Sequence, residues 1–356
     1  MGLIGGIAAA VVSVVLSSAL LLALSVDPYT ALTALLEGAF GSNFGFGQTV
    51  AKTTPILLAG AGIALALSAK LFNIGAEGQI YIGGLAGAWV GLQVPGPPAL
   101  QLLSGLIASV LAGGIWAGIA GVLKARRGVN EVIVTLLLNY VAILFVNYLV
   151  EGPFKAAGAT SPRSEDLPES ALLPKLMANT QAHAGIVIAV VAAVLGTLVL
   201  RKTVLGYRIR MLGGGEKTTR YAGVSVSGLT IGTLLISGAC AGLAGGIEIF
   251  GVHGALVQNF SPNYGFYALA VALLARGKPV MVIPFAALFG VLLAGANNLQ
   301  AVTGVPADAI SAIDGIIVLC VVAAYAAEEL LRERLARQRV RAQESTEQGL
   351  AEPVAG

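Results

Sequence analysis

Charged residues are scarce in this chain. Of its 356 residues only 11% are Asp, Glu, Lys or Arg, whereas a soluble domain averages about 25%. Hydrophobic residues make up 56% of the sequence. A chain with so few charges needs lipid to cover its outer faces, and its buried backbone groups then have to pair within helices. The composition excludes an ordinary soluble enzyme and predicts an all-α polytopic membrane protein.

Cysteine and histidine are almost absent. The two cysteines, Cys240 and Cys320, lie far apart in apolar stretches, which is not the pattern of a disulfide framework. Neither His183 nor His253 has a second His, Cys or carboxylate at the spacing of a metal site. The H-E-x-x-H and G-x-S-x-G motifs are also missing. We therefore expect no catalytic residue, no metal and no cofactor in this chain, and an intramembrane enzyme has no motif in its favour.

Long apolar segments are abundant instead. Most approach the ~20 residues that a membrane-spanning helix needs. The segment 263–275 is shorter and predicts a half-helix or a re-entrant element, and Pro55 is expected to interrupt the second segment. The first segment has the alternative of a signal peptide, but no basic residue precedes Lys52, which favours a membrane helix. The ten segments are 2–26, 51–69, 71–93, 99–123, 130–150, 183–200, 226–250, 263–275, 279–299 and 307–327.

The basic residues are distributed unequally between the two sides that these segments define. Ten crossings place both termini on one side, and 17 of the 21 Lys and Arg residues then share that side. The positive-inside rule makes this side cytoplasmic. The prediction is a transmembrane domain over 1–327 with a cytoplasmic loop at about 201–225 and an external loop at about 151–182, followed by a polar cytoplasmic tail at 328–356. Because the basic residues do not form a continuous patch, we expect contact with membrane lipid and none with nucleic acid.

Glycines recur at four-residue spacing in two segments. Each series places hydrogen atoms instead of side chains along one helix face, so that a neighbouring helix can approach closely. We expect a packing role first, and sliding of helices during transport as the functional alternative. The two series are Gly83, Gly87, Gly91 and Gly238, Gly242, Gly246.

Polar residues inside the apolar segments are the candidates for a transport path. Asn73, Glu77 and Gln79 fall within seven residues, and Asn73 and Glu77 are expected to share a helix face. Intramembrane polar groups usually face the bundle interior or a water-filled path. The alternative is that they hydrogen-bond breaks in neighbouring helices. The candidate path residues are Asn73, Glu77, Gln79, Asn139, Glu248 and Asp314.

The cytoplasmic segment from Thr203 to Val224 predicts a docking element. Glu216 and Arg220 are four residues apart in the order that stabilises a helix, and a short helix is expected over 216–222, after flexible glycines. The run Gly213–Thr218 is only superficially similar to a phosphate-binding loop, because no Gly directly precedes its Lys. The functional interpretation is a helix that fits a groove on a cytoplasmic motor subunit; the alternative is a basic helix on the membrane surface. The docking candidates are Gly215, Glu216, Lys217, Arg220, Tyr221 and Gly223.

Four stretches carry a family resemblance. Leu71–Gly84, LFNIGAEGQIYIGG, resembles the signature of ABC-importer permeases of the branched-chain amino acid and ribose superfamily, and it is especially similar to nucleoside (guanosine/purine) permeases. Val129–Asn139, Leu205–Val224 and Gly265–Arg276 resemble further stretches of the same family in the same order. The resemblance covers roughly residues 50–325.

The resemblance implies a machine with several subunits. Such permeases pair, often as two paralogues, on two cytoplasmic ABC ATPase domains that use the ATP, and a substrate-binding lipoprotein or periplasmic protein delivers the ligand. The expected location is a bacterial or archaeal cell (inner) membrane. The expected function is alternating access for a nucleoside, with a ribose-type sugar as the alternative. A different class remains open, an ion-coupled secondary transporter with Glu77, Glu248 or Asp314 as a relay.

Overall fold

The structure is a computed structural model that describes residues 18–306 without a break. It also describes thirteen scattered positions outside this range, three before it and ten after it. The chain divides into two units, Val26–Pro306 and the two ends together, Met1–Ser25 with Ala307–Gly356. Almost all of the continuously described residues belong to the first unit, Val26–Pro306. About half of each of the predicted spans 2–26 and 307–327 lies outside the described residues, and the tail 328–356 lies wholly outside them.

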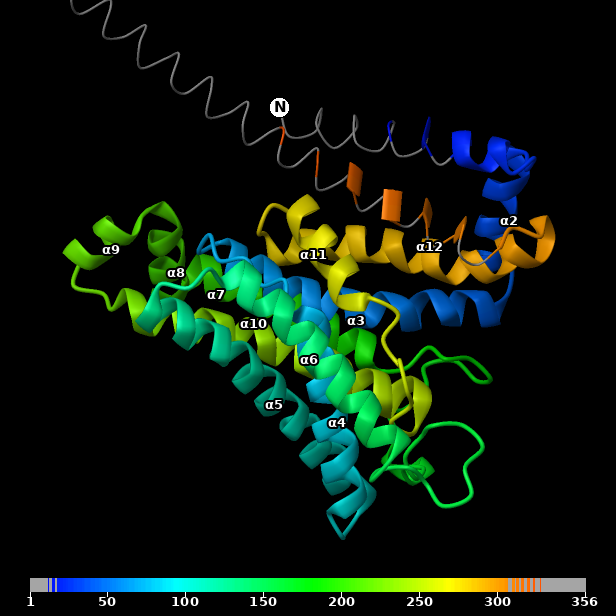
Figure 1. Ribbon diagram of the computed structural model, residues 1–356, viewed down its shortest axis with the longest axis horizontal. Helices are drawn as coiled ribbons and strands as arrows, with labels where there is room; N and C mark the ends of the chain where they lie inside the picture. The colour runs from blue at the N-terminus through cyan, green and yellow to red at the C-terminus, as the bar shows by residue number, and fades with distance from the viewer. Residues whose placement is uncertain are drawn as a thin grey trace, which may run out of the picture. The chain divides into compact units, whose positions relative to one another are not determined.

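Every regular element of the described residues is helical, which confirms the all-α prediction (Figure 1). The elements are α2 (Pro28–Phe40), α3 (Asn43–Leu67), α4 (Ala76–Gln93), α5 (Pro98–Arg127), α6 (Glu131–Glu151), η1 (Glu169–Ala171), α7 (Gly185–Lys202), α8 (Val204–Gly214), α9 (Glu216–Tyr221), α10 (Val226–Glu248), η2 (Ile249–His253), α11 (Tyr264–Leu274), η3 (Pro279–Met281) and α12 (Val282–Thr303).

Six of the described segments are long and apolar enough to cross a membrane. They correspond to α3, α5, α6, α7, α10 extended by η2, and α12 preceded by η3. Helix α11 has only 11 residues, about 16 Å of helix, which is far less than the ~30 Å of a bilayer core. The segment is therefore a short helix, which agrees with the expectation of a half-helix or a re-entrant element.

Pro55 does not interrupt α3, contrary to the sequence-based expectation. The helix continues from Asn43 to Leu67 with Pro55 inside it. A proline in a helix removes one N–H donor, but membrane helices tolerate this where hydroxyl side chains satisfy nearby backbone groups. The hydroxyls of Thr54 and Thr53 donate to the carbonyls of Val50 at 2.8 Å and Thr49 at 2.7 Å, in the turn beside the proline. The carbonyl that loses its helical donor to Pro55 is that of Ala51.

The segment 71–93 is not one helix, and this corrects a second expectation. Helix α4 begins only at Ala76, and residues 71–75 are non-helical. Asn73 and Glu77 therefore do not share a helix face. The side-chain oxygen of Asn73 accepts from the backbone N–H of Gly75 at 3.1 Å, a local bond that favours a turn over a helix.

Two helices were not expected from the apolar pattern. Helix α2 follows Asp27, whose side chain caps it by accepting from the N–H of Thr30 at 2.9 Å. Helix α8 includes Gly213 and Gly214, which were expected to be flexible. The short helix expected over 216–222 is present as α9.

Glycine contacts form the centre of the bundle, where α10 packs against α4 and α5. A Cβ on Gly83 would overlap the backbone of Gly242, and one on Gly242 would overlap the carbonyl oxygen of Ser109. A Cβ on Gly238 would likewise overlap the carbonyl oxygen of Gly113 in α5. The predicted packing role of both series is confirmed by these contacts, and sliding of the helices stays a prediction.

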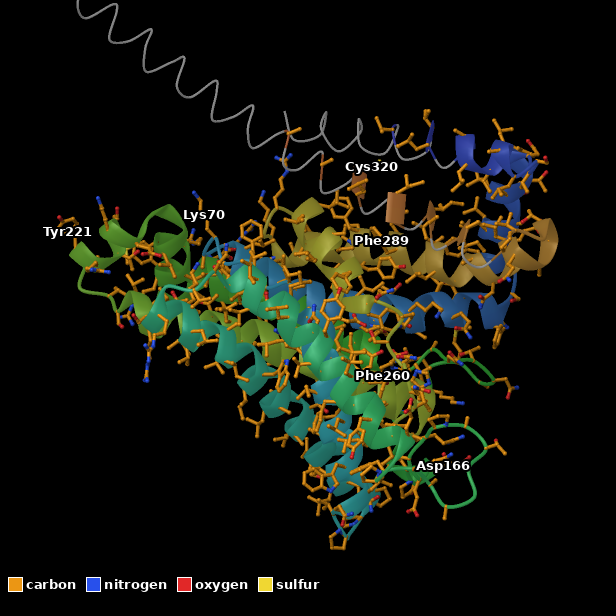
Figure 2. The ribbon with its side chains drawn as sticks, viewed as in Figure 1. Lys70, Asp166, Tyr221, Phe260, Phe289 and Cys320 are labelled. Carbon is orange, nitrogen blue, oxygen red and sulfur yellow. The ribbon has the colours of Figure 1, made fainter. Side chains whose placement is uncertain are left out.

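Several basic segments that the charge pattern assigns to one side meet at one end of this unit. Lys70, Lys124 and the residues Gly213–Glu216 line one small cavity of about 220 Å³. The loop after α11 joins them, because the hydroxyl of Ser68 donates to the carbonyl of Gly277 at 2.9 Å. Figure 2 shows Lys70 and Tyr221 toward this end, and Asp166 of the predicted external loop toward the opposite end. The grouping agrees with the sequence; which end faces the cytoplasm stays a prediction.

Candidate functional site

The start of α4 is a buried polar network. Asn73 is fully buried, and its amide nitrogen donates to the side-chain oxygen of Gln79 at 2.8 Å and to the hydroxyl of Ser237 on α10 at 2.9 Å. The amide nitrogen of Gln79 donates back to the oxygen of Asn73 at 2.9 Å. The two amides therefore satisfy each other and fix the segment before α4 to α10.

Asn139 of α6 completes this network. Its side-chain oxygen accepts from the backbone N–H of Gly78 at 2.8 Å, and its nitrogen donates to the carbonyl of Ile74 at 2.9 Å. The N–H groups of a first helical turn have no partner within the helix. Because Gly75 at the N-cap position makes no side-chain capping bond, Asn139 acts as a cap supplied by another helix.

Glu77 performs the same task for α11. Its side chain is 1% exposed, and its carboxylate accepts from the backbone N–H of Gly265, in the first turn of α11, at 2.6 Å. Asn263, which precedes the helix, has φ = 66° and makes no capping bond of its own. A Cβ on Gly265 would overlap the backbone of Glu77, so α4 and α11 are in direct contact.

The segment 254–263 leads into α11 as a non-helical stretch of bends and turns with one isolated bridge residue, Val257. Its backbone pairs with the loop around 163–167: the N–H of Ser164 donates to the carbonyl of Leu256 at 2.8 Å, and the N–H of Leu167 to that of Gly254 at 2.8 Å. The segment then reaches α4, where the rings of Phe260 and Tyr81 lie 4.8 Å apart. Phe260 is labelled in Figure 2. The segment therefore connects the predicted external loop with the middle of the bundle.

Glu248 lies at the end of α10, apart from this network in the chain. Its side chain is 3% exposed, and one carboxylate oxygen lies 3.5 Å from Nε2 of His253. The π-helical turn Ile249–His253 follows directly, a deviation that is frequent at functional sites. The second oxygen of Glu248 has no hydrogen-bond partner among the described residues. Asp314 lies outside the described residues.

The six docking candidates belong to a projection formed by α8 and α9. Tyr221 is 92% exposed, and Lys217 and Arg220 are exposed beside it. The projection contains Gly215 at φ = 155° between the two helices and Gly223 at φ = 73° after them. Glu216, Lys217, Arg220 and Tyr221 surround a hollow of about 440 Å³.

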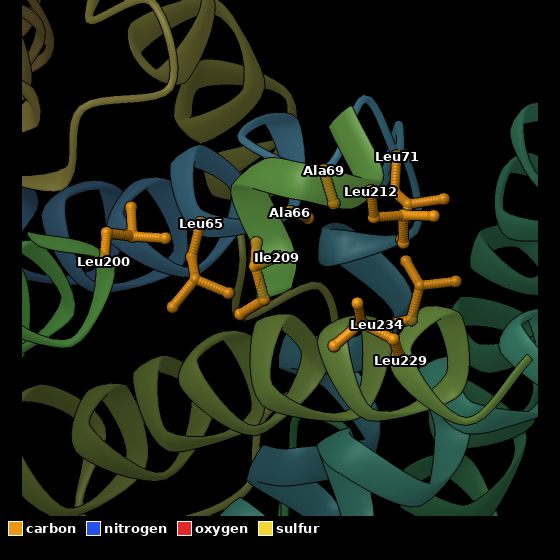
Figure 3. Packing of buried hydrophobic residues seen from close by; sticks show 9 residues of the cluster. All are labelled: Leu65, Ala66, Ala69, Leu71, Leu200, Ile209, Leu212, Leu229 and Leu234. Carbon is orange, nitrogen blue, oxygen red and sulfur yellow. The ribbon is translucent and has the colours of Figure 1, made fainter. Parts of the chain in front are cut away.

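The root of this projection is packed into the bundle (Figure 3). Ile209 and Leu212 of α8 join a buried cluster with the end of α3 and the turn after it. A Cβ on Gly213 would overlap the carbonyl oxygen of Ser68 in that turn. The cluster consists of Leu65, Ala66, Ala69, Leu71, Leu200, Ile209, Leu212, Leu229 and Leu234.

A larger polar cavity of about 720 Å³ lies between α2, the start of α3 and the second half of α12. Its volume falls within the ~300–1,000 Å³ of small-molecule sites. Sequence reasoning missed it because α2 was not expected, although Gln48 and Asn297 are polar residues close to apolar segments. The lining residues are Glu37, Gly38, Gly41, Ser42, Phe44, Gly45, Gln48, Ala294, Asn297, Asn298 and Ala301.

These features are suited to non-covalent work. Within residues 18–306 and the scattered positions beyond, no three His, Cys, Asp or Glu side chains gather where they could hold a metal ion. The fold combines helices that cross a membrane, a helix too short to cross it and an exposed two-helix projection. It therefore defines a multi-pass membrane protein with an exposed two-helix projection.

The chain belongs to the family described as branched-chain amino acid transport system / permease component, whose model matches residues 45–322. It is 36% identical over 309 residues to a glucose ABC transporter permease of Haloferax volcanii, covering 84% of this chain and 81% of that protein. It is 37% identical over 297 residues to a guanosine ABC transporter permease of Bacillus subtilis, covering 83% and 85%. A nucleoside ABC transporter permease of Lactococcus lactis is 29% identical over 341 residues, covering 93% of both chains. The chain is thus an ABC transporter permease.

Two of these organisms have a second permease of the same description. The further guanosine permease of Bacillus subtilis is 26% identical to this chain, and the further nucleoside permease of Lactococcus lactis is 23% identical. Paired permeases of this kind indicate a second permease subunit.

Proposed function

We propose that this chain is the membrane-spanning subunit of an importer for nucleosides. Membership of the permease family carries the proposal, and two of the three relatives described above are named for guanosine or nucleosides. A nucleoside is uncharged and rich in hydroxyl and amide groups. The cavity between α2, α3 and α12 offers Gln48, Asn297 and Asn298 as partners for such groups and has no basic residue in its lining.

The partners proposed are a second permease, a cytoplasmic ABC ATPase that uses the ATP and a substrate-binding lipoprotein. The projection of α8 and α9 is the proposed ATPase contact. Its support is the exposure of Arg220 and Tyr221, because arginine and aromatic residues dominate the binding energy of many interfaces. The whole docking set proposed is Gly215, Glu216, Lys217, Arg220, Tyr221 and Gly223.

The polar residues of the bundle have different roles in this proposal. Asn73, Glu77, Gln79 and Asn139 shape the transport path by holding the starts of α4 and α11, since their hydrogen bonds are made within the protein. Glu248, with an unpaired carboxylate oxygen, is proposed to face the path. Asp314 is also proposed as a path residue, because it lies in the last apolar segment of the sequence.

The proposed topology has ten transmembrane or re-entrant segments, with both termini in the cytoplasm of a bacterium or archaeon. The permease domain covers 1–327 and the polar tail 328–356. The charge distribution and the meeting of basic segments at one end support this arrangement.

Sugar transport is the second candidate, and the glucose permease of Haloferax volcanii supports it. The deciding experiment is ATP-driven uptake by the complete transporter in proteoliposomes, with labelled guanosine and labelled glucose in competition. Saturable guanosine uptake that glucose does not inhibit is the expected result, and the reverse selectivity would favour the sugar. Proton-driven uptake by this chain alone, without the ATPase, would contradict the ABC mechanism.

A further inference from the structure

Helix α11 is tied at both ends to one short stretch of chain, residues 68–77. At its start, Gly265 donates its backbone N–H to the carboxylate of Glu77 at 2.6 Å. Just beyond its end, the carbonyl of Gly277 accepts from the hydroxyl of Ser68 at 2.9 Å. The helix of 11 residues is thus held between two hydrogen bonds whose partners are only nine positions apart in sequence.

The same stretch is the seat of the α8–α9 projection. The backbone of Gly213 lies against the carbonyl of Ser68, and Leu212 packs with Leu71 in the buried cluster (Figure 3). Ser68 therefore contacts α8 through its carbonyl and the end of α11 through its hydroxyl. A displacement of α8 cannot leave residues 68–71 in place without opening a packed interior, and packed interiors transmit strain.

The far end of this connection is the non-helical segment 254–263. Because α11 follows that segment directly, a shift of α11 moves Phe260, which lies against Tyr81 and Gly84 of α4. The segment is also bonded to the loop around Ser164. The connection thus runs from the projection to the segment that leads toward the predicted external loop.

We infer that Glu77 and Ser68 are positioning residues that couple the α8–α9 projection to α11, so that movement of the projection moves α11 and the segment before it. The inference rests on the proposed docking of α8 and α9 on the ATPase. Neither residue touches the ligand in this scheme, and Glu77 acts as a hydrogen-bond acceptor rather than as a charge. This distinguishes it from a proton relay, for which a titratable carboxylate is indispensable.

The test uses the assembled transporter, with both permeases, the ATPase and the binding protein, in proteoliposomes. The measured quantity is ligand transported per ATP hydrolysed for Glu77→Ala, Glu77→Gln and Ser68→Ala. The control is Ser109→Ala, which removes a fully buried hydroxyl that bonds only within its own helix. We expect at least about a tenfold fall for Glu77→Ala and a smaller fall for Ser68→Ala. Glu77→Gln, which keeps an acceptor oxygen, should stay within about twofold of the native transporter, and so should Ser109→Ala.

Two outcomes would overturn the inference. If Glu77→Gln is as defective as Glu77→Ala, the charge is required and the acceptor role is wrong. If Glu77→Ala and Ser68→Ala both transport normally per ATP, the two ties do not carry the coupling. If Glu77→Ala does not assemble, Ser68→Ala still tests the coupling role, and Glu77→Gln still tests whether the charge is required.

Hydrogen–deuterium exchange supplies a readout other than transport. ATP should change the exchange of peptides covering 254–270 in the native transporter, and this change should be lost in Ser68→Ala and retained in Glu77→Gln. An unaltered ATP response in Ser68→Ala contradicts the coupling role. Copurification of the ATPase with Arg220→Glu is measured in parallel, and it tests the docking proposal separately. If copurification stays intact, the docking proposal fails. The hydrogen bonds of Glu77 and Ser68 are then judged only by the exchange of peptides covering 254–270.

Discussion

The side-chain oxygen of Asn139 accepts a hydrogen bond from the backbone N–H of Gly78 at 2.8 Å. Asn139 belongs to α6 and Gly78 to the first turn of α4, so one helix caps another. The carboxylate of Glu77 caps α11 in the same way through Gly265. Both helices begin at buried positions inside the bundle, and a polar side chain from a neighbouring helix accepts from an N–H group of the first turn.

The first prediction concerns this cap. Asn139→Ala leaves the N–H of Gly78 and the carbonyl of Ile74 without partners in a buried place, which should destabilise the permease by about 1–3 kcal/mol. The midpoint of thermal unfolding in detergent measures the effect. Asn147→Ala is the matched control on α6, because its bond to Asn259 is exposed. Equal midpoints for the two variants would show that the cap is dispensable.

The second prediction concerns the glycine contacts of α10. Gly242→Ala places a methyl group against the carbonyl oxygen of Ser109, and such overpacking should cost about 1–3 kcal/mol or more. Gly232→Ala in the same helix has no atom within 4 Å of the new Cβ and should be neutral or slightly stabilising. The yield of monodisperse protein and its unfolding midpoint report the difference. A stable Gly242→Ala variant contradicts the close-packing argument.

The third prediction tests the docking surface. Arg220→Glu reverses the charge beside the exposed Tyr221 and should reduce copurification of the ATPase at least about tenfold, which corresponds to about 1.4 kcal/mol. The permease itself should remain folded, because Arg220 is exposed. Lys155→Glu, in the predicted external loop, should leave copurification intact. Undiminished copurification with Arg220→Glu counts against α9 as the contact.

The fourth prediction concerns the cavity between α2, α3 and α12. Gln48→Ala and Asn297→Ala each remove a hydrogen-bonding group from its lining. Each should raise the KM for guanosine uptake about two- to tenfold, since a hydrogen bond to a ligand contributes about 0.5–1.5 kcal/mol. Gln300→Ala, an exposed residue of the same helix outside the lining, is the control. An unchanged KM in both cavity variants places the ligand elsewhere.

The sequence predicted the helices where periodicity and length were decisive, and it failed where side chains compete with the backbone. The apolar segments appear as α5, α6, α7 and α10 nearly as expected. The start of α4 was placed too early because Asn73 forms a turn through its own side chain, which hydropathy does not register. Pro55 was expected to break α3, yet the helix continues through it from Asn43 to Leu67.

The candidate site shows the same division. The sequence singled out Asn73, Glu77, Gln79 and Asn139 because polar groups at membrane depth are costly. It could not say which of them would meet, since Glu77 and Gly265 lie 188 positions apart. Nor could it reveal the cavity beside α2, whose lining comes from three separate helices.

The sequence by itself determined that the chain is an all-α membrane protein and a member of a permease family, because composition and ordered motifs are local properties of the chain. Only the tertiary structure decided what the polar residues do. Hydrogen bonds in a bundle form between segments distant in sequence, and they turn Asn139 and Glu77 into caps for α4 and α11. The physical reason is that the first N–H groups of a helix that starts inside a bundle are satisfied by acceptors that are close in space. Such acceptors can be far away in sequence, so the sequence alone does not identify them.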